Sequence, residues 1–150
     1  MCRKKYEFWQ FILGVVHLHT VNIMYEDLSE KFEKFKEIHY EFNDLVVFSN
    51  QGEIFFQTES ANLNPRDCQN ILDSWLHHEK DVILHEIRYS ILKTDIYQYA
   101  ALNPSLKRGI VGSMDKEFNY AIGLVESERN PENFLLLSSI ELNKLVWDMN

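Results

Sequence analysis

The chain has 150 residues, a formal net charge of −8 at pH 7, and 45% hydrophobic residues with only five Gly and three Pro. This length and composition fit a single globular domain with its own core. The negative charge argues against a general nucleic-acid binder or broad attachment to anionic lipid, because both depend on clustered Lys and Arg. The two cysteines, Cys2 and Cys68, form no disulfide framework, and we expect Cys68 to be a buried thiol.

Residues 1–23 differ in composition from the rest of the chain. Three basic residues, Arg3, Lys4 and Lys5, precede a mostly apolar run from Phe8 to Leu18. The run is shorter than the ~20 apolar residues that span a bilayer, and no small-residue cleavage site follows it. An appendage lying on a membrane or on the domain, a signal-like segment, and an unstructured leader all stay open. We predict an N-terminal extension over residues 1–23 and one domain over residues 24–150.

The domain is predicted to begin with an amphipathic helix over residues 25–38. Charged residues occupy one face of this helix. The apolar side chains of the other face recur at spacings of three and four: Tyr25, Leu28, Phe32 and Phe35. A β-hairpin follows, with strands over residues 45–48 and 54–56. Asn50-Gln51-Gly52 between them is typical of a turn, because Asn and Gly tolerate positive φ.

Two further helices are marked by Asn-Pro pairs. Asn64-Pro65 and Asn130-Pro131 each place a capping residue before a proline in the first turn. Four strands are predicted between these helices, over residues 87–93, 96–102, 109–114 and 118–125. Short polar turns join them, which indicates an antiparallel meander. The last helix has two apolar lines, one formed by Leu135, Leu142 and Val146 and the other by Leu136, Ile140 and Trp147. We expect one line to cover the sheet and the other to contact the first helix.

From residue 25 to Trp147 this order of elements resembles the profilin family. Five segments carry the resemblance: Gly52–Gln57, Leu63–Asp67, Ile87–Leu92, Gly109–Gly123 and Asn130–Asn133. The family implies an α+β fold, with an antiparallel sheet of about six strands. The N- and C-terminal helices would pack on one face of the sheet and a shorter helix on the other. Departures from the family pattern, such as Tyr25-x-x-Leu28 in place of Trp-x-x-Tyr, make this a divergent, plausibly archaeal-type, profilin.

The resemblance implies a cytoplasmic, monomeric protein that binds actin monomers, regulates polymerisation and docks proline-rich segments between its terminal helices. Candidate polyproline-binding residues are Tyr25, Leu28, Phe55, Ile140, Leu145 and Trp147. Candidate actin-binding residues are Arg88, Tyr97, Lys107, Arg108, Lys116, Glu128 and Arg129. Phosphoinositides are a weaker candidate partner, at Lys107 and Arg108. The alternative for the first set is packing of the helices on the sheet, and for the second set it is solvated surface charge.

The sequence offers no catalytic constellation. His77, His78 and His85 lack a recurring ligand spacing, Ser138-Ser139 has no nucleophile elbow, and no Gly-rich phosphate loop occurs. We therefore expect neither enzyme activity nor a cofactor. Two other functions stay open: a dimeric adaptor of roadblock or longin type, and a lipid-surface protein anchored by residues 3–18. Trp9 and Phe11 of the extension are also candidates to occupy the polyproline groove in the free protein.

Overall fold

The computed structural model describes residues 27–126 and 131–147, and Tyr25, Glu128, Arg129 and the predicted extension lie outside them. Its centre is a seven-stranded antiparallel sheet with the strand order β2-β1-β7-β6-β5-β4-β3. The strands are β1 (Phe42–Phe48), β2 (Ile54–Gln57), β3 (Asp81–Leu84), β4 (Ile87–Thr94), β5 (Gln98–Asn103), β6 (Arg108–Met114) and β7 (Tyr120–Glu126). Residues 27–38 are helical, and a short 3₁₀ helix, η1 (Glu59–Ala61), follows β2.

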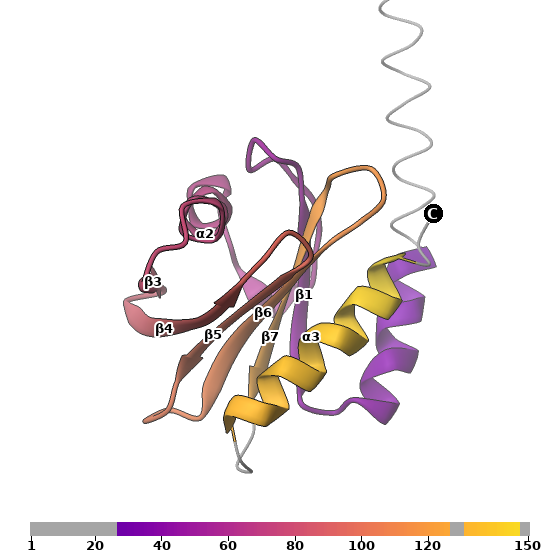
Figure 1. The fold of residues 1–150 in the computed structure, drawn as a ribbon. Helices are drawn as coiled ribbons and strands as arrows, with labels where there is room; N and C mark the ends of the chain where they lie inside the picture. The colour runs from indigo at the N-terminus through magenta and orange to yellow at the C-terminus, as the bar shows by residue number, and fades with distance from the viewer. Residues whose placement is uncertain (1–26, 127–130, 148–150) are drawn as a thin grey trace, which may run out of the picture.

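The helices cover the two faces of the sheet as predicted. The helix of residues 27–38 and α3 (Pro131–Trp147) lie on one face, and α2 (Pro65–Leu76) lies on the other (Figure 1). Each face has its own buried cluster: Phe32, Phe42 and Leu142 belong to the first, and Trp75 and Tyr99 to the second. The predicted α+β architecture is therefore confirmed, with one strand more than expected.

The start of α2 follows the sequence signal closely. The Asn64 side chain accepts a hydrogen bond from the Asp67 backbone N–H at 2.8 Å, and the Asp67 carboxylate accepts one from the Asn64 N–H at 3.0 Å. Pro65 occupies the first turn, where no backbone donor is missed. Cys68 then points into the core, and burial raises the pKa of its thiol to about 12. The prediction of a buried thiol is confirmed.

Tyr99 anchors the sheet beneath α2 through a buried hydroxyl pair. Its hydroxyl lies 2.9 Å from Ser74 Oγ, and Ser74 Oγ in turn donates to the Ile71 carbonyl at 2.7 Å. Since the Ser74 hydrogen is used in that second bond, the Tyr99 hydroxyl is the donor in the first. Burial raises the pKa of Tyr99 to about 12.

Strand β3 was not predicted, because the sequence analysis places no strand between the second helix and residue 87. Its alternation is short: Val82 and Leu84 are buried, while Ile83 between them is exposed. The turn into β4 also lacks the usual Asn-Gly signal. His85 and Glu86 occupy it with φ angles of 50° and 65°. A two-residue hairpin loop with a type I′ turn requires positive φ at both positions.

Two predicted strands begin later than expected. Ile96 and Phe118 were assigned to strands, but β5 begins at Gln98 and β7 at Tyr120, which leaves both apolar residues exposed in turns. An aspartate begins each turn and its carboxylate accepts backbone N–H groups, so the chain bends where hydrophobicity alone predicts extension.

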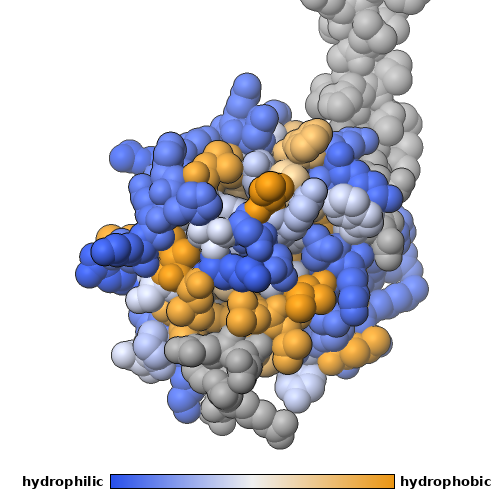
Figure 2. All heavy atoms as spheres, viewed as in Figure 1, coloured by the Kyte–Doolittle hydropathy of each residue, from blue (hydrophilic) through white to orange (hydrophobic). Residues whose placement is uncertain are grey.

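The second apolar line of α3 is not covered by the N-terminal helix, contrary to expectation. Leu136, Ile140 and Trp147 are 37%, 42% and 37% exposed. The N-terminal helix packs on the other flank of α3, where His39 Nε2 lies 3.6 Å from Glu141 Oε2. Apolar side chains consequently reach the surface of the molecule on the face that carries α3 (Figure 2).

Candidate binding surfaces

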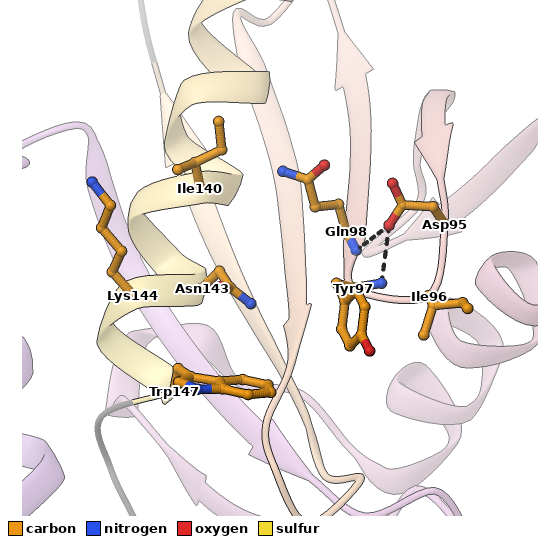
Figure 3. Close-up of a pocket in the computed structure, with 8 residues that line it drawn as sticks. All are labelled: Asp95, Ile96, Tyr97, Gln98, Ile140, Asn143, Lys144 and Trp147. Atoms are coloured by element: carbon orange, nitrogen blue, oxygen red, sulfur yellow. Dashed lines mark hydrogen bonds between the residues drawn. The ribbon is translucent and has the colours of Figure 1, made fainter.

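A groove lies between the C-terminal half of α3 and the turn that joins β4 to β5. Its volume is about 800 Å³, and eight residues line it: Asp95, Ile96, Tyr97, Gln98, Ile140, Asn143, Lys144 and Trp147. The side chains of the turn and those of α3 face each other across it (Figure 3). Four of these residues are aliphatic or aromatic, two are amides, and Asp95 and Lys144 are charged.

The turn wall of the groove is held in place by Asp95. One carboxylate oxygen of Asp95 accepts hydrogen bonds from the backbone N–H groups of Tyr97 at 2.9 Å and Gln98 at 2.8 Å (Figure 3). The Asp95 carbonyl accepts a further bond from Trp75 Nε1, at 2.6 Å. Trp75 is a buried residue of α2, so the core itself fixes the turn that carries Tyr97.

Two aromatic rings meet at one end of the groove. The rings of Tyr97 and Trp147 have centroids 6.4 Å apart and planes at 85°, an edge-to-face arrangement that aromatic pairs favour. Lys116, from the turn between β6 and β7, places its ammonium 5.4 Å from the Trp147 ring centroid. This is within the range of a cation–π interaction. Trp147 is thus held between two turns of the sheet.

A polar seam beside the groove fixes α3 on the sheet. Asn143 donates a hydrogen bond to Ser113 Oγ at 2.7 Å, and Gln98 Nε2 lies 3.2 Å from Ser139 Oγ. Both serines are buried, so their hydroxyls need these partners. The two bonds fix the amide side chains at the floor of the groove, and one amide hydrogen of each makes no bond to another described residue.

The structure describes five of the six candidate polyproline residues and does not bring them all to one surface. Ile140 and Trp147 line the groove, where they meet Tyr97, which sequence analysis assigned to the other surface. Leu28 is only 2% exposed, and Phe55 and Leu145 pack partly buried against the same core cluster. Sequence analysis missed five groove residues: Asp95, Ile96, Gln98, Asn143 and Lys144. Only the aspartate that begins the turn could have placed Ile96 outside a strand.

The candidate actin-binding residues fall at two opposite ends of the strands. Arg88 is the second residue of β4 and pairs with Asp81 at 2.9 Å, and Arg108 begins β6 and pairs with Glu126 at 3.1 Å. Lys107 lies between them in the turn from β5 to β6. We call Arg88, Lys107 and Arg108 the basic end. Tyr97 and Lys116 lie at the other end, beside the groove.

No group of three or more His, Cys, Asp or Glu residues in the described part of the chain could hold a metal ion. No described helix is long and apolar enough to cross a membrane.

Comparisons with known proteins decide the family. No protein-family model matches the chain. Loki profilin-3 from Lokiarchaeum, however, is 30% identical over 110 residues, which cover 73% of this chain and 87% of that protein. The chain belongs to the profilin family. This confirms the resemblance noted from the five sequence segments and its archaeal character.

Solved profilin structures share the fold of this profilin. LokiProfilin1, in a complex with rabbit actin, matches with a TM-score of 0.62 and 17% identity over 81% of this chain and 95% of its own. LokiProfilin2, also in a complex with rabbit actin, matches with a TM-score of 0.62 and 16% identity over 81% and 96%. Profilin II of Acanthamoeba castellanii matches with a TM-score of 0.58 and 12% identity over 72% and 84%.

Proposed function

We propose that this profilin binds an actin or actin-like monomer and thereby regulates polymerisation. The observation that carries the proposal is its membership of the profilin family, whose structures most like it include two complexes with rabbit actin. The protein acts by equilibrium binding in the cytoplasm, as a monomer next to the cytoskeleton. A bound monomer is withdrawn from nucleation and elongation by mass action, without bond chemistry.

The basic end is the surface that we assign to the actin-like partner. It combines exposed cations with an apolar residue, since Leu106 is exposed in the same turn as Lys107. An apolar anchor with a polar rim is the usual composition of a non-obligate interface. The chain leaves β7 at Glu126, next to Arg108, so Glu128 and Arg129 follow this surface directly in sequence.

Titration of the full chain into labelled actin monomers tests this assignment. Arg88→Glu and Arg108→Glu, each alone, should weaken monomer binding about fivefold or more, as expected for residues within an interface. Lys34→Glu is the matched control, because it makes the same charge change on the exposed face of the N-terminal helix. If all three variants lose the same affinity for actin monomers, or if none of them loses any, the basic end is not the interface.

Proline-rich segments are the second class of partner that we propose. The favouring observation is that Trp147 and Ile140 line an open groove, since aromatic-lined grooves are the usual receptors of polyproline II segments. Binding of a proline-only peptide to the full chain, followed by chemical-shift mapping, tests this second partner independently of actin.

A further inference from the structure

An exposed apolar stripe runs along α3 with no protein element over it among the described residues. Leu136, Ile140 and Trp147 follow one another at spacings of four and seven, so they share one flank of the helix. Across the groove, Ile96 and Tyr97 are 71% and 51% exposed. This concentration of exposed apolar side chains marks an interaction site.

The groove offers several hydrogen-bond donors to a ligand. Neither the Trp147 indole N–H nor the Tyr97 hydroxyl has a hydrogen-bond partner within the described part of the chain. Gln98 and Asn143 each keep a second amide hydrogen. A bound helix would satisfy its own backbone carbonyls, whereas a polyproline II segment has no internal hydrogen bonds and presents every carbonyl to its receptor. The donors therefore favour the extended ligand.

The ammonium group of Lys116 places a positive charge beside the Trp147 ring. Lys116 lies over Trp147 and makes no ion pair with any described residue. The nearby charges are already paired, Lys144 with Glu141 at 3.1 Å and Asp95 with Lys93 at 3.6 Å. A ligand that brings a carboxylate next to its prolines would complement Lys116.

We propose that the Tyr97–Trp147 groove binds a proline-rich segment carrying an acidic residue, on the flank of α3 that faces away from the N-terminal helix. The prolines pack on the two perpendicular rings, and the ligand carboxylate meets Lys116. This inference rests on the proposed proline-binding function for the class of partner. It differs from the expected site between the terminal helices, where Leu28 is buried and Glu141 faces His39.

The test uses the full chain and two peptides: a proline-only peptide and the same peptide with a glutamate at each end. Affinity is measured by titration, and the binding surface by backbone and Trp side-chain chemical shifts. Tyr97→Ala should weaken both peptides about fivefold or more. Lys116→Ala should weaken the glutamate peptide more than the proline-only peptide, so that a two- to fivefold preference between the two peptides is lost. Tyr40→Ala is the matched control, an exposed aromatic residue outside the groove.

The outcomes distinguish the assignment of the Tyr97–Trp147 groove from the proposal that the protein binds proline-rich segments at all. Binding that is insensitive to Tyr97→Ala and shifts residues of the N-terminal helix would overturn the inference and leave proline binding intact. Binding of neither peptide overturns both, while actin binding stays a separate question. If Trp9→Ala moves the signals of residues 95–98 and neither peptide does, the chain's own N-terminal segment is the occupant and the proposal is wrong.

Discussion

Replacing Asp95 by alanine should loosen the wall of the groove that carries Tyr97. The carboxylate accepts two backbone hydrogen bonds, at 2.9 and 2.8 Å, and its side chain is 46% exposed. Hydrogen bonds to a charged group contribute about 1.5–3 kcal/mol when they are well shielded, so about 1 kcal/mol each is reasonable for this half-exposed acceptor. The local opening free energy should therefore fall by about 2 kcal/mol, equivalent to about a 30-fold increase in opening.

Native-state amide hydrogen exchange measures this change directly. The amides of Tyr97 and Gln98 should exchange about 30-fold faster in Asp95→Ala, and Asp95→Asn should show a smaller effect because its amide oxygen can still accept. Asp115→Ala is the matched control: Asp115 caps the neighbouring turn in the same way, accepting from the N–H groups of Glu117 and Asn119. Unchanged exchange at Tyr97 and Gln98 in Asp95→Ala would refute the reasoning.

Three further predictions concern stability, and denaturant unfolding measures each of them. Gly112→Ala should cost about 1–3 kcal/mol, because its Cβ would lie 2.7 Å from Trp75 Cζ3 and 2.9 Å from Tyr99 Cβ; Trp75→Phe should relieve part of that loss. Stability should fall by about 2–3 kcal/mol between pH 10 and 12, because Tyr99 ionises near 10 when unfolded and near 12 when folded; Tyr99→Phe should remove this part of the alkaline loss. Asn64→Ala should cost about 1 kcal/mol through the lost cap, and Asn64→Ser much less.

Much of the fold could be predicted because its boundaries are local. Asn64-Pro65 specifies a helix start by its own hydrogen bonds, and Gly52, at a φ of 81°, provides the turn of the first hairpin. Strand β3 could not be predicted in this way. It is an edge strand of four residues, and His85 and Glu86 adopt positive φ only because the paired strands hold them there.

The groove was harder to predict because no local pattern identifies the neighbours of a helix flank. The spacing of Leu136, Ile140 and Trp147 predicts an apolar line, but it does not say whether a helix or a turn lies opposite. Tyr97 lies fifty residues from Trp147 in the sequence and reaches it because β5 and β6 place two aspartate-capped turns at one end of the sheet. The pairing is therefore a product of strand register.

The same register keeps the two proposed surfaces apart. Gln98 pairs with Ser113 at the groove end of β5 and β6, and Asn103 pairs with Arg108 at the basic end. The six residues of β5 run from one of these pairs to the other and span roughly 17 Å, so a segment packed on Trp147 would leave the basic end uncovered. Both partners should therefore bind at once, and a saturating proline-rich peptide should leave the affinity for actin monomers unchanged. Strong competition between the peptide and actin monomers would mean that they share one surface. At least one of the two surfaces would then be wrongly assigned.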